Sequence, residues 1–344
     1  MKTVQLIRTG APLEAREVPT PAPGAHEVLV RIEAAGICHS DAHYRAGTSD
    51  VSFLPITLGH EIAGTVVKLG ASVSGISLGS RVAIHYLRSC GQCEYCVRGL
   101  EQFCTTGRMF GKHLQGGYAE FVVVPAANAI TVPEAVSLDA AAIMMCSSAT
   151  AFHALHKARF AAGERVAVFG AGGLGLSAIQ LARIGGAAEI YAVDTSREKL
   201  RAAAQFGAVP VYPADGPPAE QLRALTHGAG VDVALEFAGV PATQAQAVAV
   251  LAVRGRAAFA GIGAAPFSLH AYPEIINREV ELVGVSDHLR GELVTLMGFA
   301  ARGLLDLESV IADRMPLDAT QINRHLDALA DFFGATRSVI HPAQ

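Results

Sequence analysis

A glycine-rich turn near the middle of the chain constrains its fold more than any other feature of the sequence. The motif GAGGLG (170–175) follows RVAVF (165–169), an apolar segment typical of a buried strand, and opens a helical segment. Gly170 permits a tight turn, Gly172 lets the backbone approach a pyrophosphate, and Gly175 lets helix and strand pack closely. The helix start also offers unpaired N–H groups and a positive dipole to phosphates. The alternative is a glycine-rich turn without a ligand.

An acidic residue after the next predicted strand indicates which dinucleotide would bind. The segment EIYAV (189–193) is that strand, and Asp194 lies 19 residues beyond Gly175. A carboxylate here accepts hydrogen bonds from both ribose hydroxyls and repels a 2′-phosphate, which predicts NAD rather than NADP. Asp194 could instead only cap the helix predicted over 196–206. The backbone contacts expected in the turn are Gly170, Gly172, Gly173, Leu174 and Gly175.

The rest of the chain divides into two kinds of pattern. Strands and helices alternate from Arg165, with further strands predicted at 231–237, 257–261 and 281–285, which indicates a parallel, doubly wound sheet of the α/β class. The N-terminal part has short runs rich in Val and Ile, separated by Gly and Pro, and predicts a β-rich barrel or sandwich. Its expected strands are 27–32, 64–69, 81–84 and 118–124. At the C-terminal end we expect helices at 292–302 and 320–332 and a strand at 338–340.

Composition excludes several classes of partner. The net charge is −4, and no run of Lys or Arg provides the basic surface that nucleic-acid binding needs. The longest apolar stretch, 140–152, is shorter than the roughly 20 residues that cross a bilayer, so we expect no membrane span. The N-terminal segment has no apolar signal core, which favours a cytoplasmic protein. Cysteines there are usually reduced, so the six cysteines are better explained as ligands or core residues than as disulfides.

Four of these cysteines form the pattern C-x2-C-x2-C-x7-C. Four thiolates suit a closed tetrahedral zinc site with a structural role, because no position remains open for a substrate. The alternative is an iron–sulfur cluster, but bacterial ferredoxins continue with a three-residue spacing and Cys-Pro. The proposed structural zinc ligands are Cys90, Cys93, Cys96 and Cys104.

Three further potential ligands are scattered, and spacing alone cannot identify them as a site. Cys38 lies in CHSDAH, His60 in GHEIAG and Cys146 in MMCSSATAF. Together with the four-cysteine segment and GAGGLG, these motifs make the chain resemble a zinc-dependent alcohol dehydrogenase of the medium-chain dehydrogenase/reductase family. The resemblance covers nearly the whole chain, up to GATRSV (334–339).

The resemblance implies a GroES-like catalytic domain over 1–147 and 286–344 and a Rossmann domain over 148–285. Cys38, His60 and Cys146 would hold a catalytic zinc whose fourth position is open, so each chain would carry two zinc ions and NAD. The implied reaction is the reversible oxidation of an alcohol to an aldehyde or ketone, with a zinc-stabilised alkoxide and hydride transfer to the nicotinamide C4.

The same resemblance assigns further roles. Ser40 and His43 would relay the proton, Asp41 would orient His60, and Glu61 would approach the zinc during ligand exchange. Their alternatives are a turn residue, a surface histidine, a helix cap and an ion-paired carboxylate. The remaining implied contacts are His39 and Arg337 with the pyrophosphate, Lys199 with the adenosine ribose, and Tyr86 with a small alcohol substrate.

Alternative functions remain at this point. Related polyol dehydrogenases often carry Glu at the position of Cys146 and commonly lack the full four-cysteine segment, so an alcohol dehydrogenase is favoured. A zinc-ribbon binding module fits less well, because it leaves the second set of Cys and His ligands unexplained. A catalytically silent cofactor-binding protein also fits less well, because no ligand or proton-relay position is broken. The low charged fraction of 17% hints at surface hidden in a homo-oligomer, and the chain length resembles that of tetrameric more than dimeric relatives.

Overall fold

The computed structural model describes residues 1–263, 265–330 and 337–342. The chain forms two compact units. The first unit comprises Met1–Cys146 and Leu289–Gln344, and the second comprises Ser147–His288. The boundaries expected from the sequence, after residues 147 and 285, differ from these by one and three residues.

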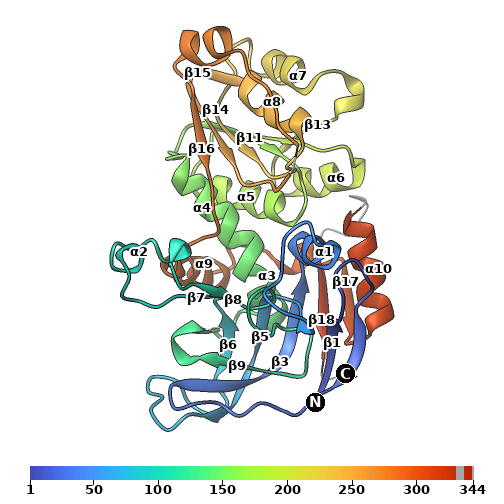
Figure 1. Cartoon of the computed structure of the whole chain (residues 1–344). Helices are drawn as coiled ribbons and strands as arrows, with labels where there is room; N and C mark the ends of the chain where they lie inside the picture. Colours follow the sequence, from blue (N-terminus) through green and yellow to red (C-terminus); the bar gives the residue numbers. More distant parts are fainter. Residues whose placement is uncertain (264, 331–336, 343–344) are drawn as a thin grey trace. The chain divides into compact units, whose positions relative to one another are not determined.

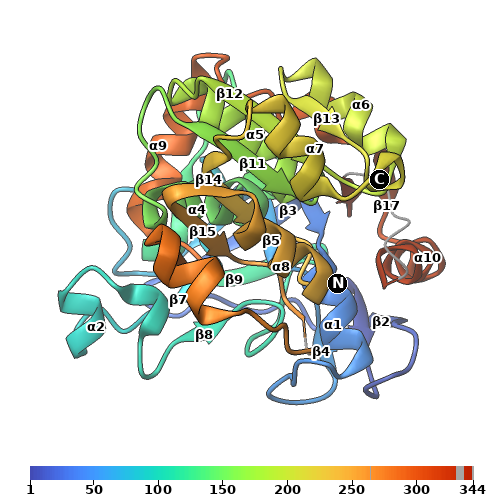
Figure 2. The ribbon, with the colours of Figure 1, turned by 90° about the horizontal axis from the view of Figure 1, so that it is seen from above.

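The second unit is built on a six-stranded sheet in which every neighbouring pair is parallel, in the order β13-β12-β11-β14-β15-β16. Its strands are β11 (Arg165–Phe169), β12 (Glu189–Val193), β13 (Val209–Val211), β14 (Val231–Glu236), β15 (Leu251–Phe259) and β16 (Glu281–Gly284). Its longer helices are α4 (Ala149–Lys157), α5 (Gly173–Ile184), α6 (Arg197–Gln205), α7 (Pro218–Leu225) and α8 (Pro241–Ala249). Helices lie on both faces of the sheet (Figure 1, Figure 2), which explains why the central strands β11 and β14 are apolar except for charged residues at or near their ends. The predicted Rossmann sheet is therefore confirmed.

The first unit is β-rich, as the sequence predicted. A larger sheet has the order β10-β6-β5-β3-β18-β17, with β9 paired to β3, and smaller sheets are formed by β2-β1-β4 and β7-β8. Its strands are β1 (Lys2–Leu6), β2 (Glu14–Glu17), β3 (Glu27–Ile37), β4 (Ile56–Thr57), β5 (Glu61–Leu69), β6 (Arg81–Ile84), β7 (Leu87–Arg88), β8 (Arg108–Met109), β9 (Phe121–Pro125), β10 (Ala129–Thr131), β17 (Asp313–Pro316) and β18 (Ser338–His341). Its α-helices are α1 (His39–Ala46), α2 (Glu94–Val97), α3 (Leu138–Ile143), α9 (Arg290–Ala301) and α10 (Ala319–Ala330). Residues 331–332 of the predicted last helix and 334–336 of GATRSV lie outside the described residues.

The C-terminal segment completes the large sheet of the first unit. Strand β18 pairs antiparallel with β3, where Ser338 faces Ile37, and parallel with β17. This pairing brings Arg337 close to the turn after β3, although some 300 residues separate them in the chain. The sequence predicted the strand but gave no indication of its neighbour.

One helical run is longer than the sequence suggested. Helix α3, a π-helical turn η3 (Met144–Ser148) and α4 follow one another without a break. By length and composition the run Leu138–Lys157 could cross a membrane, whereas the apolar stretch alone seemed too short. Of its most apolar 18-residue stretch, 83% is buried inside the protein, as in a core helix.

Candidate functional site

The turn between β3 and α1 places Cys38 at the start of a helix. Cys38 has an extended backbone and precedes the first helical residue, and its N–H donates to the Asp41 carboxylate over 3.0 Å. The helix ends at Gly47, whose φ of 80° is left-handed and favours glycine. Both ends of this short helix are therefore fixed by local chemistry, which fixes the thiol of Cys38.

Asp41 is completely buried and connects four parts of the first unit. Besides Cys38, it accepts hydrogen bonds from the Gly59 N–H at 3.2 Å and the Tyr118 hydroxyl at 2.9 Å, and its Oδ1 lies 3.3 Å from His60 Nδ1. Burial lowers the pKa of His60, but the Asp41 carboxylate outweighs it and raises the pKa to about 10. Asp41 thus both caps α1 and contacts the imidazole, so the two roles considered for it coexist. No motif in the sequence indicated that Tyr118 would contact Asp41.

The side chains of Cys38, His60 and Cys146 converge in the core of the first unit. Their ligand atoms and that of Glu61 all lie within 4.8 Å of one another, and all four residues are buried. The two sulfur atoms are 3.9 Å apart. Two thiolates on one tetrahedral zinc ion are separated by about 3.8 Å, given zinc–sulfur bonds of about 2.3 Å.

Two further observations fit a metal at this point. His60 Nε2 is buried and has no hydrogen-bond partner among the described residues, which is costly unless something else binds it. The pKa of Cys38 lies well below its usual value, because the hydrogen bond with Cys146 and the neighbouring His60 outweigh the effect of burial. Zinc binds thiolate sulfur and imidazole nitrogen, and at this position it would replace the proton that the raised pKa keeps on the ring of His60.

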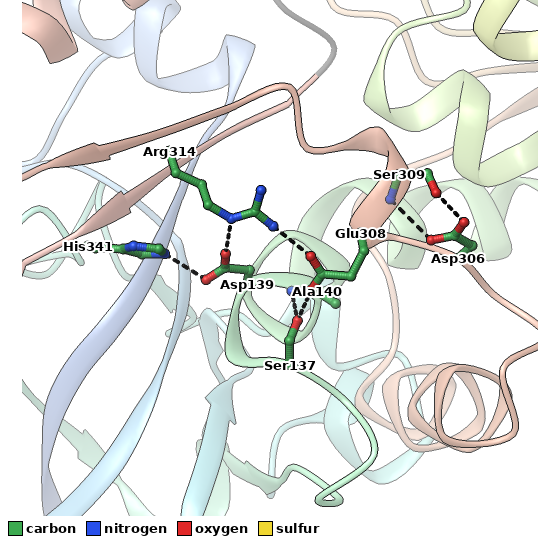
Figure 3. A network of polar contacts seen from close by, with 8 residues as sticks. All are labelled: Ser137, Asp139, Ala140, Asp306, Glu308, Ser309, Arg314 and His341. Carbon is green, nitrogen blue, oxygen red and sulfur yellow. Dashed lines mark hydrogen bonds and ion pairs between the residues drawn. The ribbon is translucent and has the colours of Figure 1, made fainter.

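Cys146 lies in the π-helical turn η3, and a polar network holds the preceding helix α3 (Figure 3). Asp139 accepts hydrogen bonds from Arg314 Nε at 2.7 Å and His341 Nε2 at 2.8 Å. Glu308 binds the same guanidinium at 2.6 Å and also the hydroxyl of Ser137, which caps α3. The C-terminal segment therefore anchors the helix that leads to Cys146. No motif in the sequence predicted this network.

Glu61 forms a buried ion pair with Arg337 through its Oε2 atom. The guanidinium is 5% exposed and the carboxylate 0%, and the other oxygen of Glu61 has no partner among the described residues. The ion-paired alternative for Glu61 is thus realised, while the carboxylate also stays within reach of the proposed ligands. The prediction for Arg337 did not include this pair.

The remaining residues predicted for this site lie on α1 and just after β6. Ser40 and His43 are half-buried and lie three residues apart on α1, so they share one side of the helix. The ring of His39 stacks on that of His43, with centroids 4.8 Å apart. Tyr86 follows β6, is 1% exposed and places its ring edge-to-face with His60 at 5.1 Å. Tyr86 therefore lies directly beside a proposed ligand.

The four remaining cysteines form a lobe (Cys90–Cys104) at the edge of the first unit (Figure 1). Their sulfur atoms all lie within 4.8 Å of one another, and those of Cys90 and Cys96 are 3.9 Å apart. The N–H of Cys93 points at Cys90 Sγ, 3.3 Å away, and backbone donors lower the pKa of Cys93 to about 6. This geometry fits a tetrahedral four-thiolate site.

In the second unit, the glycine turn has the expected conformation. Gly170 has a φ of 96°, and a side chain on Gly175 would collide with the Gly170 carbonyl. A side chain on Gly172 would meet nothing within 4 Å, so open space lies in front of this backbone. Leu174 lies in the first turn of α5, immediately after Gly173. The turn and the helix start thus have the backbone conformation that the motif predicted, with open space in front of Gly172.

Asp194 lies at the end of β12 and is linked to this turn. It accepts hydrogen bonds from the N–H groups of Ala171 and Ser196, both at 2.8 Å. The cap of α6 is Ser196, whose hydroxyl accepts from the Lys199 N–H. The alternative of Asp194 as only a helix cap is therefore wrong, because Ser196 has that role.

Comparisons with known proteins agree along the chain. Residues 24–134 match the family model described as "Alcohol dehydrogenase GroES-like domain", and residues 173–302 match that described as "Zinc-binding dehydrogenase". An NAD-dependent alcohol dehydrogenase of Sulfurisphaera tokodaii is 34% identical over 99% of this chain and 100% of its own.

Solved structures give the same result. A crystal structure of an NAD-dependent alcohol dehydrogenase has a TM-score of 0.92 and 29% identity, covering 99% of this chain and 100% of its own. A putative zinc-binding dehydrogenase from Sinorhizobium meliloti, solved bound to NADP, has a TM-score of 0.91 and 30% identity, covering 99% of each chain.

Proposed function

The chain belongs to the zinc-type alcohol dehydrogenases of the medium-chain dehydrogenase/reductase family, and on this premise we propose that it reversibly oxidises an alcohol to an aldehyde or ketone with NAD. The observation that supports this most strongly is the buried cluster of Cys38, His60 and Cys146, held by Asp41. Two thiols and one imidazole leave a fourth position for a substrate oxygen on a tetrahedral zinc ion.

The residues of the first unit would each contribute to this reaction. When bound, zinc supplies a Lewis acid for the substrate oxygen, and NAD supplies the hydride acceptor. Asp41 contacts Nδ1 of His60 and so holds its ring in one orientation, which would leave Nε2 available to bind zinc. Ser40 Oγ would accept the alcohol proton and release its own hydroxyl proton in the direction of His43, whose ring would pass a proton to solvent. Glu61 would approach the zinc while its fourth ligand is exchanged. Tyr86 would narrow the substrate site, so that small or primary alcohols are favoured.

The cofactor contacts proposed here are those that the sequence motifs and the family resemblance indicated. The glycine turn would hold the pyrophosphate, Asp194 the adenosine ribose hydroxyls, and Lys199 would lie beside that ribose. His39 and Arg337 would contact the pyrophosphate, which requires Arg337 to share its guanidinium with Glu61. Asp194→Gly should shift the preference from NAD towards NADP. A wild-type preference for NADP would contradict the role of Asp194.

Three further properties are part of the proposal. Each chain would bind two zinc ions, one in each cysteine cluster, and the enzyme would be a cytoplasmic homotetramer, a dimer being the alternative. Metal analysis of the pure protein tests the zinc count, and one zinc per chain or iron would overturn it. Light scattering coupled to gel filtration distinguishes tetramer from dimer. Cell fractionation tests the location, and recovery of the enzyme outside the soluble fraction would contradict a cytoplasmic enzyme.

The function itself is tested by a panel of primary, secondary, aromatic and polyhydroxy alcohols. NADH formation is followed by absorbance, with NADP in parallel. The highest kcat/KM should fall on a simple alcohol. A clear preference for polyols would instead support the related polyol dehydrogenases, and no reduction of NAD by any alcohol would overturn the proposal. Tyr86→Ala should improve kcat/KM for bulky secondary alcohols relative to small primary ones.

A further inference from the structure

Glu236 is a buried carboxylate in the second unit to which the proposed mechanism gives no role. It is the last residue of β14, 0% exposed, and pairs with Phe169 at the end of β11. The strand order reverses between these two strands. In open α/β sheets, ligands bind outside the carboxyl ends of the strands at such a reversal. Glu236 therefore lies at the edge of the sheet where the cofactor is expected to bind.

The side chain of Glu236 organises the loop that follows β14. Its Oε1 accepts hydrogen bonds from the N–H groups of Ala238 at 3.0 Å and Gly239 at 2.9 Å, and from the Thr243 hydroxyl at 2.6 Å. Its Oε2 is buried and has no partner among the described residues. Burial raises the pKa of this carboxyl, although its three donors oppose the rise. A buried oxygen without a partner lowers stability. A residue with only a structural role would not need to carry such an oxygen.

The backbone of Glu236 also holds the loop that follows β15. Its carbonyl accepts hydrogen bonds from the N–H groups of Ala260 and Gly261, both at 3.0 Å. The two loops touch through their backbones, because a side chain on Gly261 or Gly263 would collide with Gly239. Glu236 is thus hydrogen-bonded to both loops.

The loop after β14 also lies against the glycine turn. The Phe237 N–H donates to the Phe169 carbonyl at 2.9 Å, and a side chain on Gly170 would lie 3.3 Å from the nitrogen of Ala238. The loop that Glu236 holds therefore lies directly beside the glycine turn.

We propose that Glu236 is a positioning residue that shapes the loops after β14 and β15 to receive the nicotinamide nucleotide of the cofactor. The inference rests on the proposed NAD function. The glycine turn and Asp194, on β11 and β12, serve the adenosine half, so the strands beyond the reversal are left for the other nucleotide. Glu236 acts through the backbone that it holds and does not itself take part in the reaction.

Glu236→Ala separates this role from general loosening of the fold. Calorimetry measures the Kd of NADH, which has both nucleotides, and of ADP, which has the adenosine and the pyrophosphate but lacks the nicotinamide and its ribose. The Kd of NADH should rise about tenfold or more, since small misplacement of a binding surface has effects of this order. The Kd of ADP should change less than twofold. Equal weakening of both ligands, or no change in either, would overturn the inference.

Asp232 offers a matched control on the same strand. It lies at the other end of β14 and accepts a hydrogen bond from the Arg165 N–H at 2.8 Å. Asp232→Ala removes a half-buried carboxylate that holds a backbone N–H at the end of the strand away from the two loops. The Kd values of NADH and ADP should both stay within about twofold of the wild type. Selective weakening of NADH by this variant would contradict the proposal.

Thr243 provides a milder variant should Glu236→Ala fail to fold. Thr243→Val removes one donor to Oε1 with little change of shape and should weaken NADH about threefold without affecting ADP. Thr243→Ser keeps the hydroxyl and should restore the affinity. Identical NADH affinities for the Val and Ser variants would count against Glu236. A wild-type protein that binds no NADH would instead overturn the proposed function, and this inference with it.

Discussion

The two cysteine clusters of the first unit are built in opposite ways. Cys38, His60 and Cys146 come from the end of β3, the start of β5 and a π-helical turn, and all are buried. The other four cysteines come from one segment of 15 residues, where Cys90 is exposed and the others are partly so. The first cluster is held by the core around it, whereas the second has almost no core of its own.

This difference predicts different uses for a metal. Neither α2 nor η1 (Glu101–Phe103) of the lobe contains a buried residue, so bonds to a metal would replace the missing hydrophobic core. The buried cluster has its capped helix, the Asp41 hydrogen bonds and the anchored α3, so its ligands are positioned before a metal arrives. Loss of metal should therefore affect structure in the lobe and chemistry in the buried cluster.

The largest expected effect is on catalysis. Cys38→Ser removes a thiolate from the buried cluster, and the Lewis acid lost with it is worth several kcal/mol, so kcat/KM should fall roughly 10³-fold or more. The Kd of NADH and the melting temperature should change little, because the core around Cys38 remains. Steady-state kinetics, NADH titration and thermal unfolding measure the three quantities. Activity at the wild-type level would refute the assignment of Cys38 as a ligand.

The counterpart in the lobe should show the reverse pattern. Cys93→Ser should lower the free energy of unfolding by about 3 kcal/mol or more, since binding energy at a structural zinc site is folding energy. Limited proteolysis should then cut within 90–104, while the folded protein keeps most of its kcat. Ser89→Ala, an exposed neighbour, is the control and should match the wild type. A Cys93→Ser protein that resists proteolysis would show that the lobe does not depend on metal.

A smaller effect is expected for Asp41, which contacts the proposed ligand His60 but is not itself a proposed ligand. Asp41→Asn keeps the size of the side chain but removes the charge facing His60, and loss of such a contact costs about 10- to 100-fold in zinc affinity or activity. Competition with a chelator and kcat/KM measure these changes. Tyr118→Phe removes only one hydrogen bond to Asp41 and should cost about 1 kcal/mol of stability. If both variants behaved alike, the charge of Asp41 would have no special role.

The smallest effect concerns the anchor of α3. Arg314→Met removes two contacts of a partly exposed guanidinium, with Asp139 and Glu308, and should lower the free energy of unfolding by about 1 kcal/mol. Activity should stay within about twofold. Urea unfolding and kcat/KM test both statements. A tenfold loss of activity would mean that the network also sets the position of Cys146, which would make the two clusters differ even more.

Local features of the molecule followed from the sequence with little error. The strands β6, β11 and β12 have the predicted bounds, and the glycine turn has the predicted conformation. These features depend on residues close in the chain, such as Gly170 with its positive φ. The four-cysteine lobe belongs to the same class, because its ligands are sequence neighbours and their spacing alone allows a closed site.

The scattered site was accessible from the sequence only through family resemblance. Nothing in the spacing of Cys38, His60 and Cys146 required them to meet, and their meeting depends on sheet pairing between distant segments. The same pairing places Arg337 against Glu61, which no pattern predicted.

The sequence by itself thus determined the β-rich and Rossmann folds, the conformation of the glycine turn and the grouping of the four lobe cysteines. Only the tertiary structure decided that Tyr118 donates to Asp41, that β18 brings Arg337 to Glu61, and that Glu236 joins two loops. The physical reason is that backbone conformation and short spacings are set by neighbours in the chain. The partners of a buried charge, by contrast, are set by whichever distant segment the core packs against it.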